Sequence, residues 1–271
     1  MAFKSDLENR VMTNLSLNSN NKATPTKRYV MLETELQENQ LHLNKLSAEK
    51  RLEWAYAKFG ENFVATTSFG IQSSVLLHML KILNAKERIP VIWVDTGYLP
   101  SETYSYADKL SKMLNLDLKV VQSTISPARM EAIYGRLWET NSSNDLEKYH
   151  LIRKVMPLDN ALKDLDAHCW ASGVRGNQTD HRKSMNVIDT MRGKLALRPL
   201  LNWSQKDIFY YMKQNKLPQH PLFEKGYSTV GDWHSSGPDL GDNQGRDTRF
   251  GGLKQECGIH MPGTGLDGDG I

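Results

Sequence analysis

The chain has 271 residues, of which 39% are hydrophobic and 24% charged, and a formal net charge of +3. This composition is typical of a soluble globular protein with a filled core and excludes a disordered or collagen-like chain. A charge of +3 is too small to imply nucleic-acid binding, so an anion site requires a local cluster of basic residues. Residues 89–94 form the longest apolar run, far shorter than the roughly 20 residues that span a bilayer. With no apolar signal segment at its start, we expect a cytoplasmic protein that binds neither membranes nor nucleic acid.

The first half of the chain indicates an alternation of helices and strands. Residues 1–30 are polar and predict a mobile extension, and apolar residues at helical spacing between 32 and 59 predict one or two helices with Gly60 as C-cap. Strands are expected near 63–69, 89–95 and 118–122, with helices near 72–83 and 102–114 between them. Such alternation is typical of an α/β protein with a doubly wound, mostly parallel sheet and helices on both faces.

The second half continues the alternation and then loses it. A helix is expected within 146–165, interrupted at Pro157, followed by a buried strand at 168–174 and a strand pair at 187–200. Ser204 and Asp207 resemble a capping box at the start of a further helix. Residues 235–247 are rich in Gly and Asp and predict a flexible surface loop. We therefore divide the chain into an N-terminal extension and helix (1–50), an α/β domain (51–234) and a loop with a C-terminal segment (235–271).

The turn after the first predicted strand is a candidate phosphate site. Small residues and hydroxyls at a helix N-terminus offer backbone N–H groups and a favourable dipole to an anion. An ordinary turn with a serine N-cap is the alternative, and the Gly-Lys-Ser/Thr ending of a Walker loop is missing. The candidate ligands are Ser68, Phe69, Gly70, Gln72, Ser73 and Ser74.

Two further segments place polar residues just after buried strands, where ligands of open α/β sheets bind. Arg175 and Arg182 stand seven positions apart, and a guanidinium suits phosphate and sulfate oxygens. The alternative for Asp95 and Thr96 is that they cap the next helix, and the alternative for the arginines is that they are ordinary surface residues of a loop. The candidates are Asp95, Thr96, Tyr98 and Glu102 in one segment and Gly173, Arg175 and Arg182 in the other.

The two cysteines stand 88 positions apart, which argues against a disulfide framework and fits a reducing compartment. Cys169 lies in an apolar run and is assigned to packing. Cys257 lies in a polar, glycine-containing stretch, where Arg249, Lys254 and His260 would favour its thiolate. Cys257 is thus the candidate nucleophile, although a lone cysteine is more often inert.

In order along the chain, these segments resemble the PP-loop sulfonucleotide reductases that act on phosphoadenosine phosphosulfate (PAPS). The matching patterns are Ser-Phe-Gly-x-Gln from Ser68, Asp-Thr-Gly-Tyr from Asp95, the segment 172–182, Tyr-x-x-x-Gly-Asp-x-His from Tyr227, and Arg-Phe-x-Gly-Leu-Lys-x-Glu-Cys-Gly-x-His from Arg249. The resemblance covers about residues 53–260. It implies catalytic roles for Cys257, Glu256, His260 and Lys254, and substrate binding by the turn residues above together with Tyr227 and Arg249. Gly176 stands where the family often has an arginine, so one phosphate contact would be weaker or would be supplied elsewhere, for instance by Arg153 or Lys183.

The resemblance also implies a mechanism. Cys257 would take the sulfonate from PAPS as a thiosulfonate, and an external dithiol would then release sulfite. Thioredoxin is the expected donor, with glutaredoxin as the alternative, no bound cofactor is expected, and the family tends toward homodimers. The loop 235–247 would let Cys257 close over the substrate and later swing out to the carrier.

Three rival functions remain. Most adenosine phosphosulfate (APS) reductases bind an iron–sulfur cluster through Cys-Cys and Cys-x-x-Cys pairs, and this chain has neither, with Asp232 and Ser235 in place of the second. A cluster-free APS reductase stays open. A PP-loop ATP pyrophosphatase would need a Ser-Gly-Gly loop, and a non-enzymatic nucleotide sensor would leave Cys257 without a purpose.

Overall fold

Six strands form one sheet in the computed structural model, which describes residues 31–83, 85–241, 245–252, 256 and 258–260. The strands are β1 (Phe63–Thr67), β2 (Pro90–Val94), β3 (Asp117–Val121), β4 (Cys169–Ala171), β5 (Ile188–Met191) and β6 (Lys194–Leu197). The helices are α2 (Glu33–Asn44), α3 (Ala48–Phe59), α4 (Ser74–Ile82), α5 (Ser101–Leu114), α6 (Pro127–Tyr134), α7 (Ser143–His150), α8 (Met156–Asp164), α9 (Asp180–Lys183) and α10 (Gln205–Gln214).

The strand order of the sheet is β3-β2-β1-β4-β6-β5. All neighbours are parallel except β5 and β6, which form an antiparallel hairpin. From β1 the chain adds strands first on one side and then, with β4, on the other. The crevice that binds ligands in such sheets lies at this switch point, outside the carboxyl ends of β1 and β4. The prediction of a doubly wound, mostly parallel sheet is confirmed.

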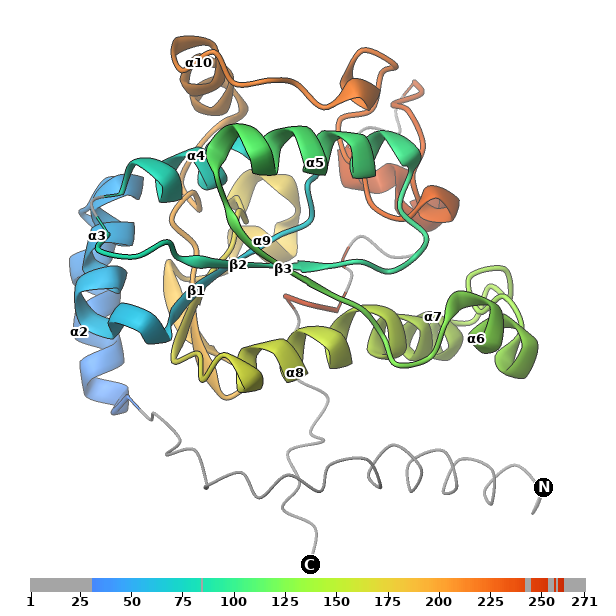
Figure 1. Ribbon diagram of the computed structural model, residues 1–271, viewed down its shortest axis with the longest axis horizontal. Helices are drawn as coiled ribbons and strands as arrows, with labels where there is room; N and C mark the ends of the chain where they lie inside the picture. Colours follow the sequence, from blue (N-terminus) through green and yellow to red (C-terminus); the bar gives the residue numbers. More distant parts are fainter. Residues whose placement is uncertain (1–30, 84, 242–244, 253–255, 257, 261–271) are drawn as a thin grey trace, which may run out of the picture.

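Helices cover both faces of the sheet because successive strand residues point to opposite sides. Phe63 and Ala65 belong to a core with α3, α4, α5 and α10, whereas Val64 and Trp170 belong to a second core with α8. Figure 1 shows α4 and α5 on one side of the strands and α8 on the other. Cys169 is fully buried in the first core, which confirms its packing role.

Local signals in the sequence explain several element ends. Ser47 accepts a hydrogen bond from the Lys50 amide at the start of α3, and Gly60 ends the helix with φ of 53°, as predicted. At α10 the expected capping box between Ser204 and Asp207 is present. Residues 1–30, expected to be a mobile extension, lie outside the described residues.

The helix expected within 146–165 is not interrupted at Pro157. A π-helical turn, η2 (Leu151–Val155), joins α7 to α8 instead, and Pro157 sits in the first turn of α8. Because η2 runs directly into α8, Pro157 lies within a continuous helical segment, and the wider π turn before it accommodates a residue that has no N–H to donate. The extra residue of the π turn is accompanied by two consecutive buried cations, Arg153 and Lys154.

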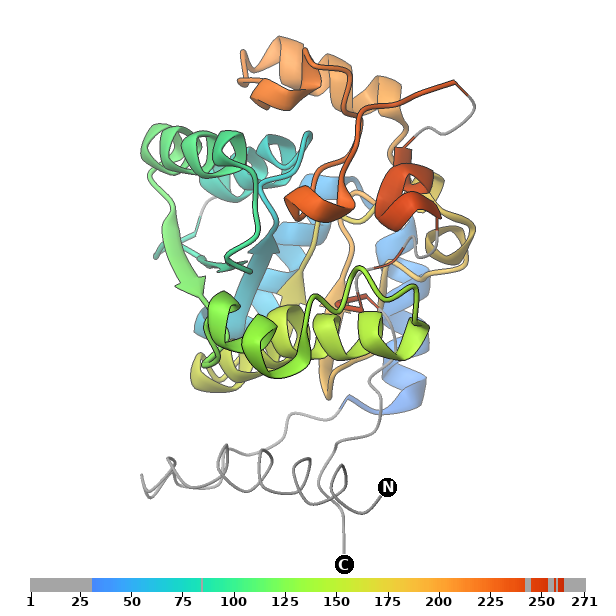
Figure 2. The same cartoon turned by 90° about the vertical axis from the view of Figure 1, so that its right-hand side faces the viewer.

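The C-terminal part holds two short helical turns, η5 (Trp233–Ser235) and η6 (Gly245–Gly252). In Figure 2 the right-hand side of Figure 1 faces the viewer, and both turns lie on this near side. Of the loop expected at 235–247, Ser235 is buried and Asp239 is bonded through its amide to the Gly226 carbonyl and through its carboxylate to Ser228. Ser235 and Asp239 are therefore anchored, and residues 242–244 lie outside the description.

Candidate active site

A cavity of about 220 Å³ lies at the carboxyl ends of β1, β2 and β4. The turns after these three strands form its wall, together with residues 228–232 and the C-terminal segment. Ten of the predicted site residues line it: Ser68, Gly70, Gln72, Ser73, Thr96, Gly173, Arg175, Arg182, Arg249 and His260. Its position is the one that the strand order predicts for a ligand.

The first turn is shaped by Phe69, whose φ of 46° is left-handed and unusual for a bulky residue. Its ring is fully buried and packs edge-on against Trp93 with centroids 4.9 Å apart. This packing holds the strained backbone and leaves Ser68 and Gly70 on the cavity wall. Phe69 and Ser74, both expected to bind substrate, are fully buried and do not line the cavity.

Of the candidate ligands after β2, Thr96 alone lines the cavity. Asp95 instead accepts hydrogen bonds from the Gly97 amide (2.8 Å), the Tyr104 hydroxyl (2.6 Å) and the Gln122 amide (2.6 Å). Its carboxylate therefore stabilises the turn. The alternative interpretation, capping of the next helix, is not what the structure shows, because the N-cap of α5 is Pro100, whose side chain makes no capping hydrogen bond.

Three other expected ligands also lie off the cavity wall. Tyr98 is buried and donates to Glu131 at 2.8 Å. Glu102, on α5, accepts a hydrogen bond from Lys225 at 2.7 Å. Tyr227 packs against a small apolar cluster. Their side chains are engaged in packing and structural bonds, which the motif pattern does not distinguish from ligand contacts.

Arg175 is the strongest candidate anion ligand. It is 6% exposed and lines the cavity; its Nη2 donates to the side chain of Gln72. Its Nη1 has no hydrogen-bond partner among the described residues. Burial, and then the charge of Arg182, lower the pKa of Arg175 to about 10, so the guanidinium stays charged at neutral pH. A buried, charged donor without a partner is costly, and an anionic ligand would satisfy it.

Arg182 is occupied by the C-terminal segment. Its Nε and Nη2 donate to the two carboxylate oxygens of Glu256 at 2.8 and 2.9 Å, and its Nη1 donates to Gln178. Thr179 also donates to this carboxylate, at 3.0 Å, and Arg246 lies 3.5 Å away. Burial alone would raise the pKa of Glu256, but these partners outweigh it and lower the pKa. Glu256 is thus an ionised anchor.

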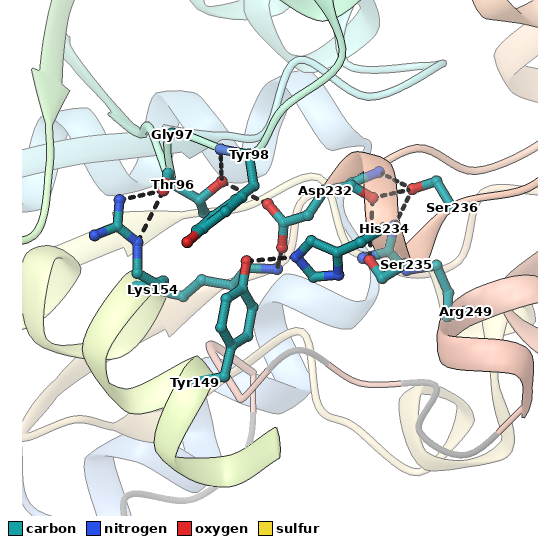
Figure 3. A network of polar contacts seen from close by, with 12 residues as sticks. Thr96, Gly97, Tyr98, Tyr149, Lys154, Asp232, His234, Ser235, Ser236 and Arg249 are labelled. Atoms are coloured by element: carbon teal, nitrogen blue, oxygen red, sulfur yellow. Dashed lines mark hydrogen bonds and ion pairs between the residues drawn. The ribbon is translucent and has the colours of Figure 1, made fainter. Parts of the chain in front are cut away.

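A buried ion pair forms another part of the wall (Figure 3). Lys154 lies 2.5 Å from Asp232, which is fully buried and also accepts from the Thr96 hydroxyl at 2.5 Å. Burial alone would raise the pKa of Asp232, but Lys154 and Thr96 hold it well below its usual value. The Lys154 charge is therefore balanced in place, and the ion pair fixes Lys154 and Asp232 at the cavity.

Arg249 lines the cavity, and its guanidinium packs against the backbone of Gly231. Its Nη1 donates to the Ser236 hydroxyl at 3.0 Å, and the same oxygen accepts from the Gly231 amide at 2.9 Å and donates to the Asp232 carbonyl at 2.9 Å. Figure 3 shows these bonds gathered on Ser236. The backbone of 231–232 thereby sets the position of the Arg249 guanidinium.

The predicted catalytic residues are only partly described. Cys257 and Lys254 lie outside the described residues. The ring of His260 stacks on Trp170, with centroids 5.7 Å and planes 13° apart. Burial and then nearby arginines lower the pKa of His260 well below its usual value. At neutral pH the imidazole is neutral, so it does not supply the positive charge expected beside Cys257.

Sequence reasoning missed several residues at the cavity, among them Lys154, Asp232 and Arg246. The two basic residues expected to replace the arginine missing at Gly176 do not do so. Arg153 donates to the carbonyls of Thr96 and Ile125, and Lys183 does not line the cavity. The adjacent Arg153-Lys154 pair was the available signal for Lys154.

Two classes of site are absent from the described part of the chain. Its His, Cys, Asp and Glu residues form no group of three or more that could hold a metal ion. Over the same residues, no helix has the length and apolar character needed to cross a membrane.

The sheet defines an α/β protein with a cavity at its topological switch point, and Arg175, Arg182 and Lys154 are among the residues that line this cavity. The sequence model of the protein family described as the phosphoadenosine phosphosulfate reductase domain matches residues 62–238 of this chain. A phosphoadenosine 5′-phosphosulfate reductase from Synechococcus sp. is 52% identical over 79% of this chain and 92% of its own length, and one from Zymomonas mobilis is 42% identical over 84% and 92%. The chain belongs to the phosphoadenosine phosphosulfate reductase family and is an enzyme.

Solved structures agree with this fold. A phosphate complex of the PAPS reductase from Candida auris has a TM-score of 0.67 and 26% identity, covering 78% of this chain and 100% of that one. An FMN adenylyltransferase from Candida glabrata has a TM-score of 0.53, with 13% identity over 78% of this chain and 70% of that one. The second likeness concerns the fold alone.

Proposed function

We propose that this protein reduces PAPS to sulfite and adenosine 3′,5′-bisphosphate in sulfate assimilation, with Cys257 as the nucleophile. The observation that carries the proposal is Arg175, a buried and charged guanidinium at the switch-point cavity, whose Nη1 has no hydrogen-bond partner among the described residues. A substrate with phosphate and sulfonate groups supplies the acceptor that this donor lacks. The names of the relatives support the same substrate.

The proposed reaction has two displacements. The Cys257 thiolate attacks the sulfonate sulfur, the bond from sulfur to the bridging oxygen breaks, and its electron pair leaves with adenosine 3′,5′-bisphosphate. A thiolate of a dithiol carrier then attacks Cys257 Sγ, and the electrons of the S–S bond leave with sulfite. The second carrier thiol closes the carrier disulfide and frees Cys257. The carrier is thereby oxidised by two electrons and the sulfonate sulfur is reduced.

The proposal includes three further assignments. Thioredoxin is the electron donor, with glutaredoxin as the alternative; the protein is a homodimer; and it is located in the cytoplasm. An external donor is required because Cys169, the chain's only other thiol, is fully buried in the core. Burial also raises the pKa of Cys169, so it is a poor nucleophile. Turnover with each reduced carrier in turn measures donor preference.

Intact-mass analysis without reductant tests the chemistry. The protein is mixed with PAPS or with APS, and the peptide that carries the sulfonate is identified. An adduct on Cys257 from PAPS alone supports the proposal, and Cys257→Ser should abolish it. An adduct from APS alone would identify a cluster-free APS reductase, and no adduct from either nucleotide contradicts the mechanism.

A further inference from the structure

The described end of the chain is held to the sheet by two arginines from separate elements. Arg182, at α9, binds the Glu256 carboxylate through two hydrogen bonds. Arg192, between β5 and β6, donates from Nε to the Ile259 carbonyl at 3.0 Å and from Nη2 to the Gly258 carbonyl at 2.5 Å. We call Arg182 and Arg192 the arginine clasp.

Arg192 occupies a backbone position that does not suit arginine. Met191 pairs with Lys194, so Arg192 and Gly193 form a two-residue hairpin turn, with φ of 56° and 65°. Turns with two positive φ values favour Asn, Asp and Gly, because a larger side chain strains the left-handed conformation. A strained residue that persists calls for a gain elsewhere.

The side chain of Arg192 supplies that gain. It is 5% exposed, and its Nη1 lies 3.1 Å from both carboxylate oxygens of Asp159 on α8. Asp159 orients the guanidinium, while Nε and Nη2 reach the two consecutive carbonyls. All three nitrogens of Arg192 therefore have partners, and two of them hold the C-terminal segment.

The residues that the clasp holds reach the cavity. Ile259 packs against the second core, His260 stacks on Trp170, and both line the cavity. Glu256 and Gly258 flank Cys257 in the sequence. The clasp thus grips the chain on each side of the proposed nucleophile.

We propose that Arg192 is a positioning residue: together with Arg182 it holds residues 256 and 258–260, on each side of Cys257 in the sequence, and so aligns Cys257 with the sulfonate. The inference rests on the proposed function of Cys257. It also assigns Arg182 to the segment rather than to the substrate, because Nε, Nη1 and Nη2 of Arg182 already have protein acceptors.

Docking can be measured without any reaction, through the titration of His260 followed by NMR of its ring. In the docked segment the pKa of His260 is lowered by burial and by Arg182, Arg198, Arg246 and Arg192, and an exposed histidine titrates at about 6.5. Arg192→Asn suits the turn and removes the guanidinium, while Arg192→Lys keeps the charge but not the fork. Both variants should raise the pKa of His260 to about 6.5. Lys194→Gln, on the same hairpin, should leave it unchanged.

A wild-type His260 pKa in either Arg192 variant overturns the clasp, whatever Cys257 does. The clasp is also overturned if the pKa of His260 rises in Arg192→Asn but not in Arg192→Lys, because the loss of a positive charge alone would then explain the rise. For the second half of the clasp, Glu256→Gln should raise the pKa of His260 as well. No change in that variant overturns the role given to Arg182.

The second measurement is the rate of sulfonate adduct formation in a single turnover with PAPS. Arg192→Asn should slow it about 100-fold, because a displacement of about 1 Å at the reacting group has that effect. Affinity for adenosine 3′,5′-bisphosphate should stay within about twofold. A wild-type adduct rate, or a matching loss of nucleotide affinity, overturns the positioning role. If the wild-type protein forms no adduct while the His260 result holds, the proposed function fails and the docking clasp stands.

Discussion

Gly231→Ala tests whether the cavity depends on where Arg249 is held. A Cβ added at Gly231 would lie 2.5 Å from Cζ of Arg249 and nearer still to both Nη atoms. Optimal carbon contacts are about 3.5–4.0 Å, so the guanidinium must move by about 1 Å. The φ of Gly231 does not lie in the left-handed region, so alanine adds little backbone strain there.

The size of the effect follows from the bond that is lost. A shift of about 1 Å breaks the 3.0 Å hydrogen bond from Arg249 to Ser236 and turns the guanidinium away from the cavity, so the bond that Arg249 is expected to give the substrate is lost. Hydrogen bonds of charged groups contribute about 1.5–3 kcal/mol, and losing one to the substrate corresponds to a loss of about 10- to 100-fold in kcat/KM for PAPS. The clash involves the end of a flexible side chain, so the free energy of unfolding should fall by no more than the bond to Ser236 contributes, about 1.5–3 kcal/mol.

Steady-state kinetics with saturating reduced thioredoxin and urea unfolding measure the two effects. Gly237→Ala is the matched control, because a Cβ there meets nothing within 4 Å, and it should behave as wild type. Arg249→Ala should reproduce the kinetic loss. Wild-type kcat/KM in Gly231→Ala, alongside a large loss in Arg249→Ala, would refute the link between the glycine and the arginine.

Three more outcomes are expected. Asp232→Asn leaves the buried Lys154 without a counter-charge and should cost about 3–5 kcal/mol of unfolding free energy; an unchanged urea midpoint would contradict the ion pair. Burial lowers the pKa of His220 and His234 to about 4. The free energy of unfolding should therefore be constant above about pH 6.5, the pKa of an exposed histidine, and should fall as the pH drops toward 4. In urea titrations at a series of pH values, His220→Gln should lose less unfolding free energy over this range than the wild type. Leu110→Ala, in the core on α5, should cost about 2–5 kcal/mol with kcat/KM unchanged, and a parallel kinetic loss would show that core packing controls the site.

The sheet could be predicted because its strands are short apolar runs between clear helices. The alternation that carries β1, β2 and β3 is visible in the sequence, and so are the hairpin and the capping box at Ser204. Helix α6 was missed because Met130 is its one buried residue, which leaves no apolar stripe. The π turn was missed because Pro157 suggested a break, whereas a π turn just before the proline lets the helix continue.

The candidate site was predictable as a set of turns but not as a set of contacts. Strand ends brought Gln72, Thr96 and Arg175 together, as parallel-sheet geometry requires. Which polar residues face the cavity depends on hydrogen-bond partners that are far away in the sequence. Asp95 is bonded to Gln122, and Arg182 is bonded to Glu256, 74 positions further along the chain. Motif spacing carries no information about such pairings.

The burial of Cys169 gives this protein a built-in reporter of its own unfolding. The thiol sits in β4, between β1 and β6, so a reagent in solution reaches it only when the centre of the sheet opens. The rate at which Cys169 becomes labelled under native conditions is then a measure of global opening, obtained without a mutation or an added dye. A stabilising change anywhere in the core should slow that labelling in proportion to the equilibrium it shifts.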